Sequence, residues 1–345
     1  MSRLWVHAQQ EALPSAAPLI ASLAAVWMWF HLLAWRAPLG FGLCWFVVFC
    51  VAQHRVMLHA RGREAARDRL ASVLVLAGSL GALVPLAFLF SFIVQKGLAP
   101  LWRSVPGFLT HDLRRAGTQD PVTSGGFWHA IIGSIEQVGF ALGFAAPIAL
   151  VTALYLNELG GRIAAPVRFV VDALSGVPSI IAGLFIYVLW VTQLRKQFSG
   201  VAGSMAIMVL VLPILIRTFE EVLRLVPGGL REAALALGAP EWKVALRIVV
   251  PTSAPGLVTG LLLGTARAVG ETAPVLLTAF GSEITNPNLF RAPQADLPLS
   301  IYQQYRFQTP NALDRAWAGS LVLTLLVLML FTVARLVIAK AAKSG

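Results

Sequence analysis

The feature that most limits what this chain can fold into is a series of long apolar runs separated by polar connections. In a bilayer, a helix of about 20 mostly apolar residues pairs every backbone group internally and crosses the hydrocarbon core. Hydrophobic residues make up 57% of the 345 residues and charged residues only 12%, which lies outside the range of ordinary soluble domains. The sequence therefore predicts an all-α integral membrane protein, a polytopic bundle of transmembrane helices.

Eight apolar runs are candidate membrane spans. The run at 39–51 is short enough to be re-entrant or interfacial, although together with the first run it fits a hairpin that turns at residues 36–38. The eight runs cover residues 18–35, 39–51, 70–94, 130–156, 169–192, 201–216, 255–280 and 316–338.

The distribution of basic residues predicts the orientation of these spans. Cytoplasmic segments of membrane proteins carry an excess of Lys and Arg. If both termini are cytoplasmic, the inner segments hold 16 of these residues and the outer segments 10. We therefore expect a multi-pass protein with both ends inside, and this placement accounts for the net charge of +11. No basic cluster is interleaved with aromatic residues, so we expect no nucleic-acid partner.

The chain lacks the sequence signatures of common catalytic and energy-coupling sites. It contains no G-x-x-x-x-G-K-[ST] phosphate loop, no H-E-x-x-H pair among its six histidines and no G-x-S-x-G elbow. Cys44 and Cys50 both fall inside one apolar run, where they act as small hydrophobes. We expect no catalytic residue, no metal site and no cofactor bound by this chain.

The connection at 217–254 is the most informative polar stretch. Two short helices are expected in it, one at 230–237 that ends at a left-handed Gly238, and one at 241–249 that Pro251 stops. Helices this short are marginal in water without tertiary packing. They therefore either lie on the membrane surface with their apolar side chains in the headgroups, or dock on a soluble subunit.

The same connection carries a family resemblance. Glu232-Ala233-Ala234, then Gly238, then Ile248 after nine intervening residues, and finally Pro251 resemble the EAA loop of ABC importer permeases, with Val250 in place of the usual Leu. In that family the loop forms coupling helices that insert into a cleft of the ATP-binding subunit. The resemblance implies that Glu232, Ala233, Ala234, Gly238, Ile248 and Pro251 contact an ATPase.

Four further strings narrow the resemblance. Residues 175–185, 212–221, 266–274 and 297–302 are similar to the A-type permeases of phosphate-specific ABC importers, in order and at family spacing. The match covers about residues 70 to 340. It implies a type I importer permease domain at 70–345 with six core spans and the coupling loop at 217–254. Residues 1–69 have no counterpart in that core, and we expect them to form an extension with a two-helix hairpin and a basic cytoplasmic loop.

The resemblance also implies partners. Such a permease works in the bacterial inner membrane beside a homologous C-type permease, above two ATPase subunits that use ATP and Mg, and below a periplasmic phosphate-binding protein that delivers the ion. This chain would then be a non-catalytic subunit that forms part of the path for phosphate through the lipid membrane.

Charged residues inside the apolar runs are the candidates for that path, because each costs about 2.5–3.5 kcal/mol at mid-membrane and needs a partner or water. Asp172 lies four residues after Arg168, and we expect the two to form a local ion pair. Glu136 shares a helix face with Gln137 and Pro147, which indicates that it faces protein or water, with its partner left open.

Arg267 and Glu271 lie on one stripe with Gly260 and Gly264, at a spacing of three or four residues. They either neutralise each other or contact phosphate, for which the guanidinium offers a fork of donors while the carboxylate keeps the contact transient. We predict the second and assign Arg267, Glu271 and Glu136 to the translocation path. The rival hypothesis is a gradient-driven anion transporter that uses Glu136, Asp172, Arg267 and Glu271 as an ion relay, but it leaves the EAA loop unexplained.

Overall fold

The structure is a computed structural model that describes residues 18–33 and 37–344. In these ranges the chain is helical apart from turns, 3-10 and π segments and one isolated β-bridge between Phe280 and Gln294. The chain divides into two compact units, Met1–Ser91 and Phe92–Gly345, and each is described by itself.

The first unit contains a helix at Pro18–Leu32, α2 at Pro38–Arg61 and the first part of α3, which runs over Arg63–Ser104. The expected short run at 39–51 is the start of a 24-residue helix, long enough to span, because the apolar pattern of α2 continues among its basic residues to Arg61. The hairpin turn that we predict at 36–38 falls partly on Arg36, which lies outside the described residues.

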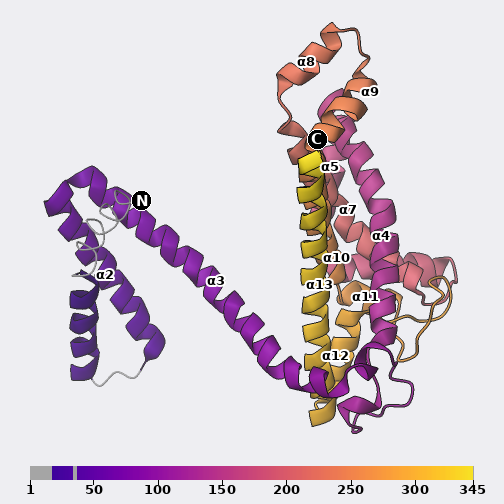
Figure 1. Ribbon diagram of the computed structural model, residues 1–345, viewed down its shortest axis with the longest axis horizontal. Coiled ribbons are helices and arrows are strands. Elements are labelled where there is room, and N and C mark those ends of the chain that lie inside the picture. Colours follow the sequence, from indigo (N-terminus) through magenta and orange to yellow (C-terminus); the bar gives the residue numbers. More distant parts are fainter. Residues whose placement is uncertain (1–17, 34–36, 345) are drawn as a thin grey trace. The chain divides into compact units, whose positions relative to one another are not determined.

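The second unit is a helical bundle (Figure 1). Its elements after α3 are η1 Gly107–Leu109, η2 Val122–Ser124, α4 Trp128–Leu154, η3 Tyr155–Leu159, α5 Ala164–Ser175, α6 Ser179–Ile186, η4 Tyr187–Gln193, α7 Gly200–Arg224, α8 Gly228–Ala236, α9 Glu241–Val244, η5 Ala245–Val249, α10 Val250–Val269, α11 Ala273–Thr278, α12 Leu297–Phe307 and α13 Pro310–Ser344.

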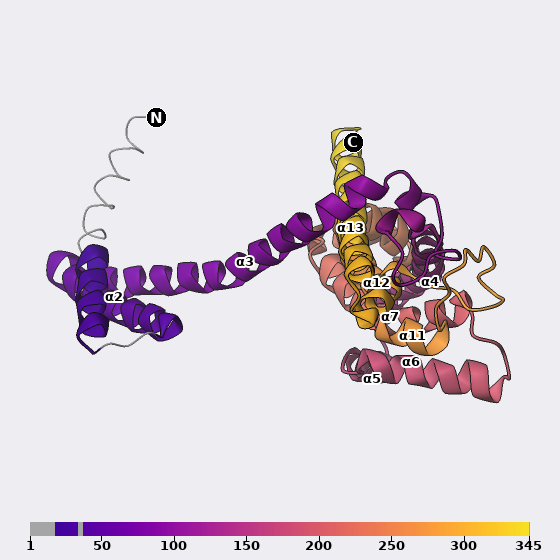
Figure 2. The same cartoon turned by 90° about the horizontal axis from the view of Figure 1, so that it is seen from below.

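Helix α7 is the centre of this bundle. It packs against α4, α5, α6, α10 and α11, and most of its length is buried. Its face toward α4 meets a row of alanines, Ala141, Ala145, Ala149 and Ala153, each fully buried. Because alanine side chains are small, the two backbones approach closely, which is how helices associate in lipid. Figure 2 shows α5 and α6 along one flank of the bundle, next to α11.

Six helices in the described ranges are long and apolar enough to span a membrane, and a bent pair counts as a seventh. The bent pair is Ala164–Ser175 with Ser179–Gln193, which meet at 105°. The segment expected as a span at 169–192 is therefore apolar enough to cross a membrane, but it is sharply bent rather than one continuous helix. Pro178 disfavours helical geometry in the residue before it, and Gly176 has little helix propensity, so the chain turns between them.

The expected single span at 255–280 is also wrong, because α10 ends at Val269 and α11 begins at Ala273. Gly270 caps α10, and Pro274 follows within the first turn of α11. Proline offers no N–H and disfavours the helical region for its predecessor, so a continuous helix through this segment would lose hydrogen bonds.

Pro251 does not stop a helix, which corrects the expectation for the second loop helix. The chain is helical from Glu241 to Val269, through α9, η5 and α10. The π segment η5 directly precedes Val250 and shifts the hydrogen-bond register ahead of the proline ring, which then stands at the start of a regular α-helical stretch.

Candidate functional site

The loop helix α8 ends as the glycine pattern predicts. Gly238 has a φ of +79°, which is the left-handed region. Its N–H bonds the carbonyl of Leu235 at 2.9 Å, and the N–H of Ala239 bonds the carbonyl of Ala234 at 3.1 Å. This pair of bonds is a Schellman cap, and a residue with a Cβ atom is strained at its glycine position.

A partly buried ion pair holds α8 onto the bundle. Arg231 on α8 bonds both carboxylate oxygens of Glu158 on η3 at 2.9 Å, and its remaining donors reach the carbonyls of Val226 and Leu223 at 2.6 and 2.9 Å. Asn157 donates to the same carboxylate at 2.6 Å. Short helices need tertiary contacts, and this two-pronged pair supplies them from within the chain.

The outer side of the same segment is apolar and exposed. Leu225 and Leu237 are 81% and 88% exposed, and Trp242 is 56% exposed. Figure 1 shows α8 and α9 beyond the end of the bundle at which α13 finishes. Of the six residues predicted to dock, the structure exposes Glu232, Ala233, Gly238 and Pro251, half-buries Ile248 and buries Ala234.

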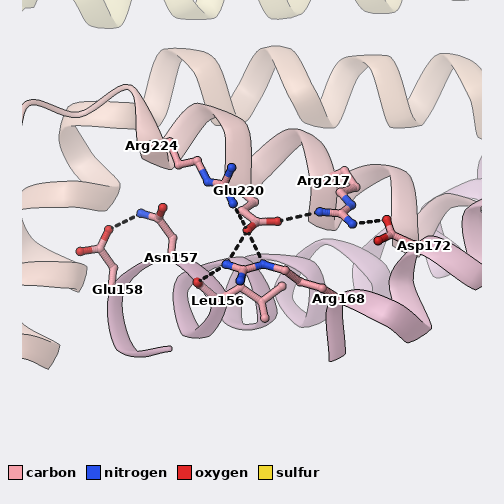
Figure 3. Close-up of polar contacts among 8 residues, drawn as sticks. All are labelled: Leu156, Asn157, Glu158, Arg168, Asp172, Arg217, Glu220 and Arg224. Carbon is pink, nitrogen blue, oxygen red and sulfur yellow. Dashed lines mark hydrogen bonds and ion pairs between the residues drawn. The ribbon is translucent and has the colours of Figure 1, made fainter. Parts of the chain in front are cut away.

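Glu220 on α7 is the most densely paired carboxylate among the described residues (Figure 3). Its side chain is 2% exposed and bonds Arg168 at 3.0 Å, Arg217 at 3.3 Å and Arg224 at 2.5 Å. Arg168 also donates to the carbonyl of Leu156 at 2.8 Å. We call Glu220, these three arginines and Leu156 the Glu220 cluster, and it joins α7 to α5 and to η3.

The expected ion pair between Arg168 and Asp172 is not formed. Arg168 turns to Glu220, and Asp172 pairs with Arg217 across the interface between α5 and α7 (Figure 3). A neighbouring helix offers Arg168 a carboxylate that is already buried and needs compensation, whereas Asp172 is exposed and does not.

Arg267 and Glu271 do meet. The guanidinium Nε lies 2.8 Å from the Glu271 carboxylate, across the break between α10 and α11. The Arg267 side chain is 56% exposed, while that of Glu271 is 8% exposed. Arg267 is ion-paired to no other carboxylate that the structure describes, and more than half of its side chain is exposed.

A second carboxyl group lies near this pair. Asp296 is 3% exposed and caps α12 by accepting the N–H of Leu299 at 2.9 Å. Burial raises the pKa of Asp296 to about 7, hydrogen bonds from Leu299 and its own N–H oppose the rise, and the negative charge of Glu271 adds to it. A cavity of about 480 Å³ lies beside the break and is lined by Gly270 and Thr272 together with residues of α12 and α13.

Glu136 belongs to a different group of residues. Its carboxylate accepts a 2.5 Å hydrogen bond from the side-chain amide of Gln294. The side-chain amide oxygen of Gln294 in turn accepts a hydrogen bond from the Gln137 side chain at 3.2 Å. Close by, the carbonyl of Ala295 packs against Gly133, where a Cβ would be only 1.9 Å from the oxygen. These contacts fasten the connection before α12 to α4 and give Glu136 a neutral amide partner.

The structure thus brings together Arg267 and Glu271 and places Glu136 and Asp172 in separate networks. Sequence reasoning missed Glu220 and the pair of Glu158 with Arg231. A signal for Glu220 was present, because Arg217 and Arg224 stand three residues before and four after it, on one face of an apolar helix. No comparable signal exists for Glu158, whose partner is 73 residues away.

Comparison with known proteins gives consistent matches. The family model described as "Binding-protein-dependent transport system inner membrane component" matches residues 145–343. The phosphate transport system permease protein PstA 1 of Mycobacterium tuberculosis (strain ATCC 25618 / H37Rv) is 41% identical over 266 residues, which are 77% of this chain and 85% of that protein. PstA of Xylella fastidiosa (strain 9a5c) is 40% identical over 245 residues, covering 70% and 82% of the two chains.

Among solved structures, the crystal structure of a bacterial ABC transporter involved in the import of the acidic polysaccharide alginate contains a chain of similar fold. The superposition covers 81% of this chain and 99% of that one, with a TM-score of 0.56 and 16% sequence identity. At this identity the likeness concerns the fold alone.

Proposed function

The chain belongs to the family of binding-protein-dependent transport system inner membrane components, among the PstA-type permeases of phosphate-specific ABC importers, and from this premise we propose that it forms part of a phosphate path. Its all-α, multi-pass architecture is that of a type I importer permease. Members of this family are transporter components rather than catalysts.

The partners in the proposal are those that the family requires. A periplasmic phosphate-binding protein delivers the ion, a homologous C-type permease completes the path, and two ATP-binding subunits hydrolyse Mg-ATP on the cytoplasmic side. Both termini and α8 with α9 face the cytoplasm, in agreement with the bias of basic residues. The chain itself binds no cofactor.

Coupling to the ATPase runs through α8 and α9. The exposed Leu237 and Trp242 offer apolar surface for docking. At protein interfaces, large apolar side chains of this kind act as anchors when they are removed from water. The Arg231–Glu158 pair supports the proposal, because it connects α8 directly to η3, which continues α4. Glu232, Ala233, Ala234, Gly238, Ile248 and Pro251 are the residues to which we assign the docking surface.

The single observation that carries the phosphate assignment within the chain is the Arg267–Glu271 pair at the helix break. The half-exposed guanidinium of Arg267 has further N–H donors that can bind a phosphate oxygen. Glu271 competes with phosphate for the same guanidinium, so the ion is bound but not trapped. Glu136 stays in the proposal as a residue that positions the outer connection above this path. The charges of the rival ion relay fall into separate networks, which gives that hypothesis no support.

Uptake of radiolabelled phosphate into vesicles that hold the complete subunit set tests the proposal. We expect uptake to need internal ATP and external binding protein, and to survive ionophores that collapse ion gradients. Gly238→Asp should abolish ATPase association, whereas Gly238→Asn, which tolerates a left-handed backbone, should retain it. Uptake that follows an ion gradient without ATP would refute the proposal.

A further inference from the structure

The corner between α2 and α3 is lined by arginines that the transport function does not use. α2 ends at Arg61, Gly62 takes a φ of +88°, and α3 begins at Arg63. Between residues 54 and 69 the chain places five arginines against two carboxylates, a net charge of +3 with the histidines neutral.

This corner has a packed inner side that fixes its shape. Ala66 is fully buried, Met57 is 5% exposed and Gln53 is 1% exposed. A ring nitrogen of His54 on α2 lies 3.4 Å from the carbonyl of Ala66 on α3, and this contact ties the two helices together close to the bend. The arginines are therefore held on a defined corner rather than on a free loop.

The outer side of the corner is basic and open. Arg55, Arg61, Arg63 and Arg67 are exposed. Arg55, Arg63 and Arg67 form no ion pair with any residue in the described part of the chain, although Glu64 is close in sequence. On α3 the two arginines are four residues apart and share a face, so their like charges repel unless an anion lies between them.

Apolar surface begins directly on both sides of these arginines. On α2, Val51 and Val56 are 57% and 40% exposed, and on α3 Leu74 and Val75 are 50% and 69% exposed. Both helices are of the length and composition that cross a membrane. The apolar faces require hydrocarbon, so the corner sits at the depth of the lipid headgroups, where phosphodiesters are the nearest anions.

From this placement we propose that the α2–α3 corner is a binding site for anionic phospholipid headgroups, held by Arg55, Arg63 and Arg67. A guanidinium matches two phosphate oxygens, and three of them on one rigid corner bind a headgroup without the cost of ordering a loop. The lipid anchors this corner at the membrane surface. This inference does not depend on which ion the importer carries.

The test measures lipid preference of the full-length chain in neutral detergent micelles. Fluorescent phosphatidylglycerol and fluorescent phosphatidylcholine are titrated separately, and inorganic phosphate is added as a competitor. Each arginine near a lipid surface contributes roughly a factor of five, so we expect phosphatidylglycerol to bind on the order of 100-fold more tightly than phosphatidylcholine. Inorganic phosphate, which has no acyl chains, should not displace the lipid.

Variants separate the corner from general surface charge. Arg55→Gln/Arg63→Gln/Arg67→Gln should reduce the preference to about twofold, while the same three changed to Lys should keep most of it. The matched control is Arg103→Gln/Arg115→Gln/Arg291→Gln, which removes three exposed arginines elsewhere and should leave the preference unchanged. Should the glutamine variant fail to fold, salt at about 0.5 M must erase the preference of the natural chain.

Three results would overturn the proposal. The first is equal affinity of the natural chain for both lipids. The second is an equal loss in the control triple variant, which indicates non-specific charge attraction. The third is full displacement of the lipid by inorganic phosphate, or binding of an acidic soluble protein in its place, which identifies a different occupant.

Discussion

Glu220 on α7 and Glu271 between α10 and α11 are both buried carboxylates, but three arginines bind the first and one binds the second. Around Glu220 every oxygen is shared among strong donors from α5 and α7. Around Glu271 the only ion-pair partner among the described residues is a half-exposed arginine at a helix break. The difference distinguishes a fully paired structural network from the pair that we propose contacts phosphate.

Removing the carboxylate of the Glu220 cluster should have the largest effect on folding. Glu220→Gln leaves three arginines facing one neutral amide, and we expect a loss of about 2–3 kcal/mol in stability, at the low end for breaking a buried pair because the arginines are partly exposed. The measurement is the yield and thermal stability of the purified complex.

Glu221→Gln is the control for that experiment, because it makes the same charge change one residue away on an exposed position. We expect it to leave both yield and stability unchanged. Equal behaviour of Glu220→Gln and Glu221→Gln would remove the distinction between the two carboxylates.

Glu271→Gln should change transport rather than folding. The variant keeps a hydrogen-bond acceptor for Arg267 but removes the charge that competes with phosphate, so phosphate should leave more slowly. We expect maximal uptake to fall by about tenfold while the half-saturating phosphate concentration also falls, the pattern of an over-stabilised ground state.

The matched control for this change is Glu283→Gln, an exposed carboxylate in the connection between α11 and α12, which should leave uptake at its natural level. A loss of folded complex in Glu271→Gln, of the size expected for Glu220→Gln, would show that Glu271 is also a structural charge.

The smallest effect is expected at Asp296. Burial is the main reason that the pKa of Asp296 is raised to about 7 in the folded protein. The folded protein therefore holds a proton that the unfolded chain releases near pH 4. Its contribution to stability is therefore complete below about pH 4 and is lost as pH rises through about 7.

Asp296→Asn keeps the cap on α12 and removes this titration. Relative to the natural chain, the variant should gain about 1–2 kcal/mol of stability between about pH 5 and about pH 8, as measured by thermal unfolding in micelles. A difference that stays constant with pH would show that the carboxyl group is ionised throughout this range.

The sequence predicted the elements of this fold better than their continuity. Apolar runs located the spans because composition alone decides which segments enter lipid. Glycine and proline at Gly176–Pro178 and at Gly270–Pro274 indicate the two helix breaks. Hydropathy is averaged over a longer window, so each broken segment looks like one continuous span. The opposite mistake occurred at Pro251, where we predicted a helix end but the helix continues because a π turn precedes the proline.

For the site, the prediction succeeded where partners are local and failed where they are distant. Arg267 and Glu271 are four residues apart and meet as expected. Arg168 and Asp172 have the same spacing but choose partners on α7, since a buried carboxylate on a neighbouring helix requires compensation more than an exposed one does. Pairings across helices depend on packing, which spacing along one helix does not encode.

The most direct test of the central claim, that Arg267 contacts phosphate, is uptake by the double variant Arg267→Gln/Glu271→Gln in vesicles with the full subunit set. Removing both charges leaves nothing unpaired in the membrane, so the complex should assemble at its natural level. The account predicts that this assembled complex hydrolyses ATP but transports no phosphate. Recovery of uptake in the double variant, after its loss in Arg267→Gln alone, would contradict the account and show that the two charges only neutralise each other.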